Sequence, residues 1–295
     1  MTADMEHELE IQIGPFQEWE GKQGKVELKI VSNGDIGTMK VKVHIEKVVA
    51  GVPNLGRISI WNLKRSTIDA LNEGGKQIRV YAGTRNATKE LLYTGSLQGV
   101  ITQRAGTDYV TTLICRTAES NLARSIVTKT WTEGVPLDTV VREIVSTIPN
   151  VIYDPNNKEI KGQIGYKGFS FMGSANDALN KLGNQFGFSW NIDNGVFSAI
   201  MDGHPRDAGI RLDSKSGLRN VSPRLSGIKQ IQTGVDIFCI YRQSIKPNQL
   251  IRVESDVNPK YSGNYDVHAV EYDLCPKDDN WDMRISTFVY QKANQ

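Results

Sequence analysis

The residue types best suited to chemistry lie in one stretch near the end of the 295-residue chain, GNYDVHAVEYDLCPKDDNWDMRIST (263–287). Its first half carries Asp266, His268, Glu271, Asp273 and Cys275. Carboxylate, imidazole and thiolate groups are metal ligands and acid–base groups. On an extended strand, Asp266 and His268 point to the same face, so this pair could chelate a metal ion.

The same letters also fit an ordinary antiparallel hairpin. A zinc site needs three or four converging ligands, whereas Cys275 lies beyond the strand, next to Pro276. Asp278 and Asp279 fall in the turn-like CPKDDN, where aspartate is favoured for local hydrogen bonding. We therefore interpret the stretch as a strand, a polar turn and a returning strand, and we expect no metal site, no cofactor site and no catalytic residue.

Other catalytic signatures are missing from the sequence. It contains no H-E-x-x-H, no G-x-x-x-x-G-K-[ST] and no G-x-S-x-G. The segment NEGGK has Gly74, Gly75 and Lys76 but lacks the rest of a phosphate-binding loop. A glycosidase-like pair of carboxylates could still come from distant segments. We nevertheless expect a protein that is not an enzyme.

Composition narrows the function classes. The chain has 35 basic and 33 acidic residues, a net charge of +2, and no basic run, which argues against nucleic-acid binding as its main role. No apolar run approaches the ~18 residues that span a bilayer. The start, MTADMEHELEIQIG, lacks the features of a signal peptide, so we expect folding in the cytoplasm. Cys115, Cys239 and Cys275 form no C-x-x-C pair and are expected to be buried thiols.

The first 116 residues have the two-residue period of antiparallel strands. One predicted strand alternates Val26, Leu28 and Ile30 with polar residues. In the next, one face is apolar, and the other, wet face carries Lys40, Lys42, His44 and Glu46. The segment KRSTIDALNEGG predicts a single short helix that is capped by Ser66 and followed by Gly74. Residues 106–108 look like a hairpin tip.

The middle of the chain favours helices. VPLDTVVREIVSTIP (135–149) carries one apolar stripe: Leu137, Val140, Val141, Ile144, Val145 and Ile148. SANDALNKLGNQFG (174–187) predicts a second helix with Ser174 as its N-cap and Gly187 at its C-terminal end. The dipeptide Asn194-Gly195 predicts a tight hairpin. From Arg211 onward the pattern is β again.

These patterns predict a mainly β (α+β) fold with three domains. The first β domain covers residues 1–116, a small helix-containing α/β insert covers 117–203, and the second β domain covers 204–295.

The order of several motifs resembles that of phage tail baseplate hub proteins, the tail-tube-like double-barrel family of contractile tails. ISIWNL is followed by a short helix, then YTGSLQGVITQ and TTLICRTAES, with Tyr93-Thr94-Gly95 as the Tyr/Phe-x-Gly turn entry. KGFSFMGSANDALNKLGNQFGFSWNIDNGVFSAI resembles the middle of such hubs, and LDSKSGLRNVSPRL resembles their linker. Residues 263–287 resemble the closing strand pair of the second barrel.

The resemblance implies two tail-tube-like antiparallel β-barrel domains in each chain. Three chains would place six barrels in a ring, a symmetry adaptor between a sixfold tail tube and a threefold central spike. Implied partners are two further copies, the tail tube protein, the central spike protein, and other baseplate and tape-measure proteins. DNA would pass through the channel only as cargo during genome ejection, and the wet face could line this channel or face outward.

The implied location is the virion tail baseplate, assembled in the host bacterial cytoplasm, with no membrane insertion. Because the sequence ends soon after the second β domain, we expect the spike to be a separate polypeptide.

Three alternatives remain at the sequence level. A tail-associated cell-wall-degrading enzyme would need convergent His, Asp or Glu side chains, or a metal ion. A hub-like part of a secretion-system spike would have nearly the same sequence features. A carbohydrate-binding module would need exposed aromatic side chains, whereas Trp61, Trp190 and Trp281 lie in strand alternation and are expected to be buried.

Overall fold

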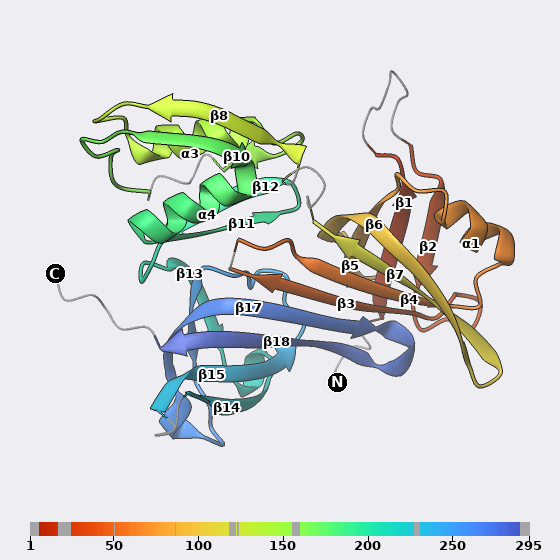
Figure 1. Ribbon diagram of the computed structural model, residues 1–295. Coiled ribbons are helices and arrows are strands. Elements are labelled where there is room, and N and C mark those ends of the chain that lie inside the picture. The colour runs from red at the N-terminus through yellow and green to blue at the C-terminus, as the bar shows by residue number, and fades with distance from the viewer. Residues whose placement is uncertain are drawn as a thin grey trace.

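The computed structural model describes residues 6–16, 25–49, 51–85, 87–117, 122, 124–154, 160–226 and 231–289. The fold is mainly β, as predicted, with a small helical part set against a large twisted sheet (Figure 1).

The N-terminal β region contains seven strands and one short helix. The strands are β1 (His7–Gly14), β2 (Leu28–Ser32), β3 (Val41–Val48), β4 (Leu55–Trp61), β5 (Gln77–Thr84), β6 (Glu90–Ala105) and β7 (Asp108–Arg116). The helix is α1 (Arg65–Leu71). The strands pair in the order β3-β4-β7-β6-β5-β1-β2. Residues 106 and 107 form the predicted hairpin tip between β6 and β7, where Gly106 has a φ of 66°.

The C-terminal β region contributes six strands. They are β13 (Arg206–Leu212), β14 (Leu218–Ser226), β15 (Ile231–Ile240), β16 (Gln249–Val253), β17 (Gly263–Cys275) and β18 (Asn280–Val289). They pair in the order β13-β16-β17-β18-β15-β14. β17 and β18 are the hairpin predicted for residues 263–287, and the left-handed Asp279, with a φ of 50°, closes its turn.

The two β regions belong to one hydrogen-bonded sheet. β17 pairs with β3 in antiparallel fashion along residues 269–274, although the two strands lie more than 200 positions apart in sequence. Val43 faces Leu274 and Ile45 faces Tyr272 across this junction. Directly paired residues share a face of the sheet, so both regions bury the same side.

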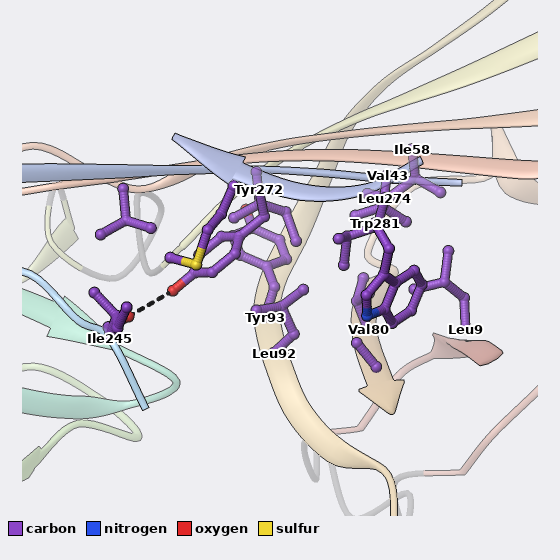
Figure 2. Packing of buried hydrophobic residues seen from close by; sticks show 14 of the residues in the cluster. Leu9, Val43, Ile58, Val80, Leu92, Tyr93, Ile245, Tyr272, Leu274 and Trp281 are labelled. Carbon is purple, nitrogen blue, oxygen red and sulfur yellow. Dashed lines mark hydrogen bonds between the residues drawn. The ribbon is translucent and has the colours of Figure 1, made fainter. Parts of the chain in front are cut away.

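A single apolar cluster lies against that buried side. It contains Leu9, Val80 and Leu113 from the first region and Val235, Tyr272 and Trp281 from the second. Figure 2 shows Tyr272 and Leu274 in one layer with Val43 and Ile58, and Tyr272 donates a hydrogen bond to the carbonyl of Ile245. The predicted burial of Trp281 is confirmed, and Met283 and Ile285, which follow it at every second position of β18, are buried with it.

The middle of the chain forms a separate layer with its own core. It contains β8 (Ile126–Trp131), α3 (Leu137–Ser146), β9 (Ile152–Tyr153), β10 (Phe169–Ser174), α4 (Ala175–Phe186), β11 (Phe188–Asp193) and β12 (Val196–Met201). β8 pairs with β10, and β11 pairs with β12, which also pairs with β9. We call residues 126–201 the insert.

Both predicted insert helices are confirmed. All six residues of the α3 stripe are buried. The Ser174 Oγ accepts a hydrogen bond from the Asp177 N–H at the start of α4, and Gly187 ends this helix with a φ of 68°. Asn194 and Gly195 also take positive φ values, of 51° and 82°, in the β11–β12 turn.

Several local predictions are wrong. Helix α1 begins after Lys64 without a side-chain cap, so Ser66 does not cap it. Val26 is exposed, because β2 begins only at Leu28. Trp61 is half-buried rather than buried, since it ends β4 under the Lys40 ammonium, 4.9 Å from the ring centroid. The segment expected to be a linker instead forms the 3-10 turn Ser214–Ser216 and strand β14.

Candidate functional site: the polar face of the shared sheet

Asp266, His268, Glu271, Asp273 and Cys275 all lie on β17 but have different surroundings. Asp266 and His268 line a cleft of about 350 Å³ between the insert and the C-terminal β region. Glu271 and Asp273 lie farther along the strand, opposite Glu46 and His44 of β3. Cys275 is buried at the end of the strand. A register shift between Val267 and Ala269 separates the first pair from the second.

The cleft perturbs its two titratable side chains from β17. Burial raises the pKa of the Asp266 carboxyl to about 6, and the nearby Asp202 carboxylate adds to the shift. Burial lowers the pKa of His268, and the positive charge of Arg224 adds to it. The His268 ring packs 4.9 Å from the ring of Phe288, between centroids. Among the described residues, no group of three His, Cys, Asp or Glu side chains is placed to hold a metal ion.

The other histidines and cysteines have structural surroundings. His7 stacks on Trp281 with 4.5 Å between ring centroids. His44 pairs with Glu46 at 3.1 Å, and a ring nitrogen of His204 contacts the carbonyl of Asp202. All three thiols are buried, as expected, and burial raises the pKa values of Cys115 and Cys239 to about 12.

The larger feature is the side of the shared sheet opposite its core, which we call the polar face. The predicted wet face of β3 is one part of it. Because β3 pairs with β17, this surface continues from the first β region into the second. Across eight strands, from β6 to β14, it carries Ile101, Gln103, Val110, Thr112, Ile114, Arg57, Ser59, Trp61, Lys42, His44, Glu46, Glu271, Asp273, Asp282, Arg284, Ser286, Asp236, Phe238, Ile240, Asn220 and Ser222.

Charges of both signs alternate across this face and pair with each other. Lys42 lies 3.2 Å from Asp273, across the junction of the two β regions. Arg57 lies 3.6 Å from Glu46 on the neighbouring strand. Asp282 pairs with Arg219 at 2.9 Å. The described part of this surface therefore has no unbroken basic stripe of the kind that grips phosphate groups.

The Tyr93-Thr94-Gly95 motif has a packing role in β6. The Tyr93 ring is fully buried, and its hydroxyl donates a hydrogen bond to the carbonyl of Asn54. A Cβ on Gly95 would lie 2.5 Å from the Tyr93 hydroxyl oxygen, and one on Gly56 would lie 2.8 Å from its ring. Glycine is therefore required beside this tyrosine, because the ring occupies the space of a side chain.

The insert is fixed to the sheet by buried polar contacts. The Lys47 ammonium of β3 lies 2.6 Å from the Asp193 carboxylate of β11, and the lysine is only 2% exposed. Burial lowers the pKa of Lys47, and Asp193 opposes that shift. The Asn54 amide donates to the carbonyl of Ile192, and the Asn194 amide donates to that of Leu91. These contacts hold the β11–β12 hairpin against the first β region.

The pairing of β3 with β17 and the ion pair between Lys47 and Asp193 were not predicted from the sequence. Both depend on partners that lie far apart in the chain, and the letters around Lys47 differ little from those of other solvated strands. The alternation in β3 did identify the wet face, but not its continuation into β17.

No helix within the described ranges is long and apolar enough to cross a membrane.

Comparisons with known proteins agree with this architecture. A family model described as baseplate hub gp41 matches residues 25–287. A tail protein from Neisseria meningitidis MC58 has a TM-score of 0.65 at 9% identity, with 96% of each chain covered. The 43 kDa tail protein of prophage MuSo2 from Shewanella oneidensis also has a TM-score of 0.65, at 11% identity, with 96% of this chain and 97% of that chain covered.

A secretion-system protein has a similar fold. The E. coli c3393 protein, a component of the type VI secretion system, has a TM-score of 0.60 at 10% identity and covers 88% of this chain and 76% of its own. No curated protein matches by sequence. At these identities the structural likenesses show the fold, which this chain shares with tail proteins. The family match extends over most of the chain, and the protein therefore belongs to the baseplate hub gp41 family.

Proposed function

We propose that three copies of this protein form the central hub of a phage tail baseplate. The observation that carries the proposal is the shared sheet, in which two β regions of one chain pair side by side and present one polar face. If each region takes one of six positions in a ring, three chains complete it. The structural role of the family supports this proposal.

In this arrangement, residues 1–116 and 204–295 are the two tube-like barrel domains and residues 117–203 are an insert domain. A closed cyclic ring uses the same head-to-tail contact between every pair of neighbours. One side of the ring would stack on the sixfold tail tube, and the other would present threefold symmetry to the central spike. The insert would contact neighbouring baseplate or tape-measure proteins.

The polar face would line the channel for genome ejection. Phosphate groups bind tightly where lysine and arginine side chains are unopposed. Here Lys42 and Arg57 have carboxylate partners on the same surface. DNA would therefore pass as cargo without being held.

We further propose that the hub is not an enzyme and acts in the virion after assembly in the bacterial cytoplasm. Asp266, His268, Glu271, Asp273 and Cys275 do not converge on one point, and this dispersal supports a structural role.

A hub-like part of a secretion-system spike is the second candidate. The similar fold of the E. coli c3393 protein favours it. The two candidates differ in the particle that would contain the protein, because only a phage hub would be found in tails attached to capsids.

Cryo-electron microscopy of tails from cells that produce this protein tests the proposal. We expect three copies in one ring between the tube and the spike, with the polar face toward the lumen. Six copies in that ring, or a location away from the tail axis, would contradict it. Dye release from peptidoglycan by the purified protein would contradict its non-enzymatic role.

A further inference from the structure

The eight-strand part of the sheet that carries the polar face ends in two free strand edges. β5 pairs with β6 only as far as Ser96, and the Leu97 N–H still donates to the carbonyl of Lys76. From Gly99 to Ala105, β6 pairs with β7 on one side and, among the described strands, with none on the other. At the far end, β14 pairs with no described strand other than β15, although the Asn258 side-chain amide donates a hydrogen bond to its Val221 carbonyl at 3.5 Å.

The free edge of β6 is open to another strand. Ala105 and Asp108 flank a two-residue turn, so their backbone N–H and C=O groups form hydrogen bonds with each other. Alternation then directs the backbone N–H and C=O groups of Arg104, Thr102 and Val100 away from β7. Natural proteins protect such edges with prolines, charges or bulges, but residues 99–105 contain no proline and a single charged side chain.

Apolar side chains are exposed next to both edges. On the polar face, Ile101 of β6 is 45% exposed. Near the other edge, Phe238 and Ile240 of β15 are 38% and 41% exposed on the same face. Much of the rest of this face is polar or charged. Ile101 lies on the edge strand itself, whereas Phe238 and Ile240 lie one strand in from the other edge and would face an added strand across Asn220 and Ser222 of β14.

The strand directions fit head-to-tail joining of two copies. Each neighbouring pair from β6 to β14 is antiparallel, and the number of strands is even. β6 and β14 of one copy therefore run in opposite directions. A rotation about an axis close to the strand direction keeps these directions, so β14 of one copy would meet β6 of the next as an antiparallel neighbour.

We propose that the free edge of β6 joins β14 of a second copy, so that Ile101 of one copy packs toward Phe238 and Ile240 of the next. This inference rests on the proposed ring and names the strands that close it.

Pro223 limits the backbone ladder at this joint. Val235, which faces Pro223, both donates to and accepts from the Thr287 hydroxyl and so directs its backbone toward β18. The backbone of Pro223 therefore points to the free edge, where it offers no N–H. On one side of Pro223, the carbonyl of Val221 already accepts a hydrogen bond from the Asn258 amide. Side-chain packing therefore makes most of the contact, and the proline hinders uncontrolled addition of other strands.

Cross-linking of the full chain tests the joint. The variant Gln103→Cys/Ser222→Cys places one exposed thiol near each edge on the polar face, while the three native cysteines are buried. We expect a short flexible bismaleimide to give covalent dimers and trimers in denaturing gels. The matched control, Lys29→Cys/Ser222→Cys, moves the first thiol to the exposed edge strand β2 and should give no product above background.

Sedimentation of the same samples separates the joint from the hub function. A trimer without cross-links, or equal cross-linking of the control, would overturn the joint and leave the hub standing. Cross-linking of the single variant Gln103→Cys would indicate dimers joined through β6 of both copies, and would also overturn the proposed joint. A monomer at every concentration, without cross-links, would count against both the joint and the trimeric ring.

Substitution of the apolar groups gives an independent measurement. Ile101→Asp and Phe238→Asp alter exposed side chains, so we expect folded monomers with unchanged circular dichroism and loss of the trimer. Trimers that persist in both variants would overturn the proposed packing.

Discussion

The ion pair between Lys47 and Asp193 should be the most sensitive link between the insert and the sheet. The two charged groups lie 2.6 Å apart, and the side chain of Lys47 is 3% exposed while that of Asp193 is 18% exposed. The Tyr272 ring lies 5.8 Å from the ammonium and helps to exclude water. Asp193→Ala would therefore leave a buried ammonium without its carboxylate.

The stability loss in Asp193→Ala has an upper limit, because the buried Lys47 can lose its proton. Removing one partner of a buried pair costs about 3–5 kcal/mol. Lysine with an ordinary pKa of 10.5 can instead give up its proton, which at pH 7 costs about 5 kcal/mol and at pH 9 about 2 kcal/mol, at 1.36 kcal/mol per pH unit. The loss of unfolding free energy in Asp193→Ala should therefore be about 3–5 kcal/mol at pH 7 and no more than about 2 kcal/mol at pH 9.

The sign of this pH dependence follows from proton binding. In the variant, the unfolded chain keeps the Lys47 proton up to about pH 10.5, whereas burial lowers the pKa of the folded state. The unfolded state binds more protons in that window, so stability rises with pH.

Urea unfolding at pH 7 and pH 9, followed by tryptophan fluorescence, measures the effect. Asp273→Ala is the matched control, since Lys42 and Asp273 lie 3.2 Å apart but are 42% and 41% exposed. This exposed pair should contribute about 0–1 kcal/mol. Equal losses in the two variants, or a loss in Asp193→Ala that does not shrink at pH 9, would refute the reasoning.

Three further outcomes are expected. Trp281→Ala should lower the unfolding free energy by about 3–5 kcal/mol, because a large buried ring is removed; little change in urea unfolding would refute its core placement. Asp266→Asn should raise the melting temperature at pH 8 relative to the parent protein and lose this advantage near pH 4. The raised pKa of about 6 means that the folded state binds more protons between about pH 4 and 6, so the parent loses stability as pH rises through that range; an advantage that does not depend on pH would contradict this explanation. His268→Ala should leave assembly unchanged, and a metal ion lost on mutation in native mass spectra would contradict the structural role of this histidine.

Patterns with a local cause could be predicted from the sequence. The stripe of α3, the Ser174 cap and the Asn194-Gly195 turn depend on neighbours a few residues away, and all three are confirmed. Ser66 shows the limit of the same logic, since α1 begins at Arg65, two residues earlier than a cap at Ser66 would require.

The shared sheet could not be predicted in this way. The pairing of β3 with β17 joins segments from opposite ends of the chain, and alternation fixes only which side of each strand is buried. It does not specify the neighbouring strand. For the same reason, the opening cluster on β17 could look like one site in the letters, although its members face a cleft, a neighbouring strand and a buried turn.

Native mass spectrometry of the purified protein tests the central claim most directly. One chain has a mass of 32.8 kDa, so a ring of three has a mass of 3 × 32.8 = 98.4 kDa. We predict a dominant species at that mass that persists on dilution. A dominant species of six chains, or a twofold dimer, would contradict the idea that two β regions per copy allow three copies to fill six positions.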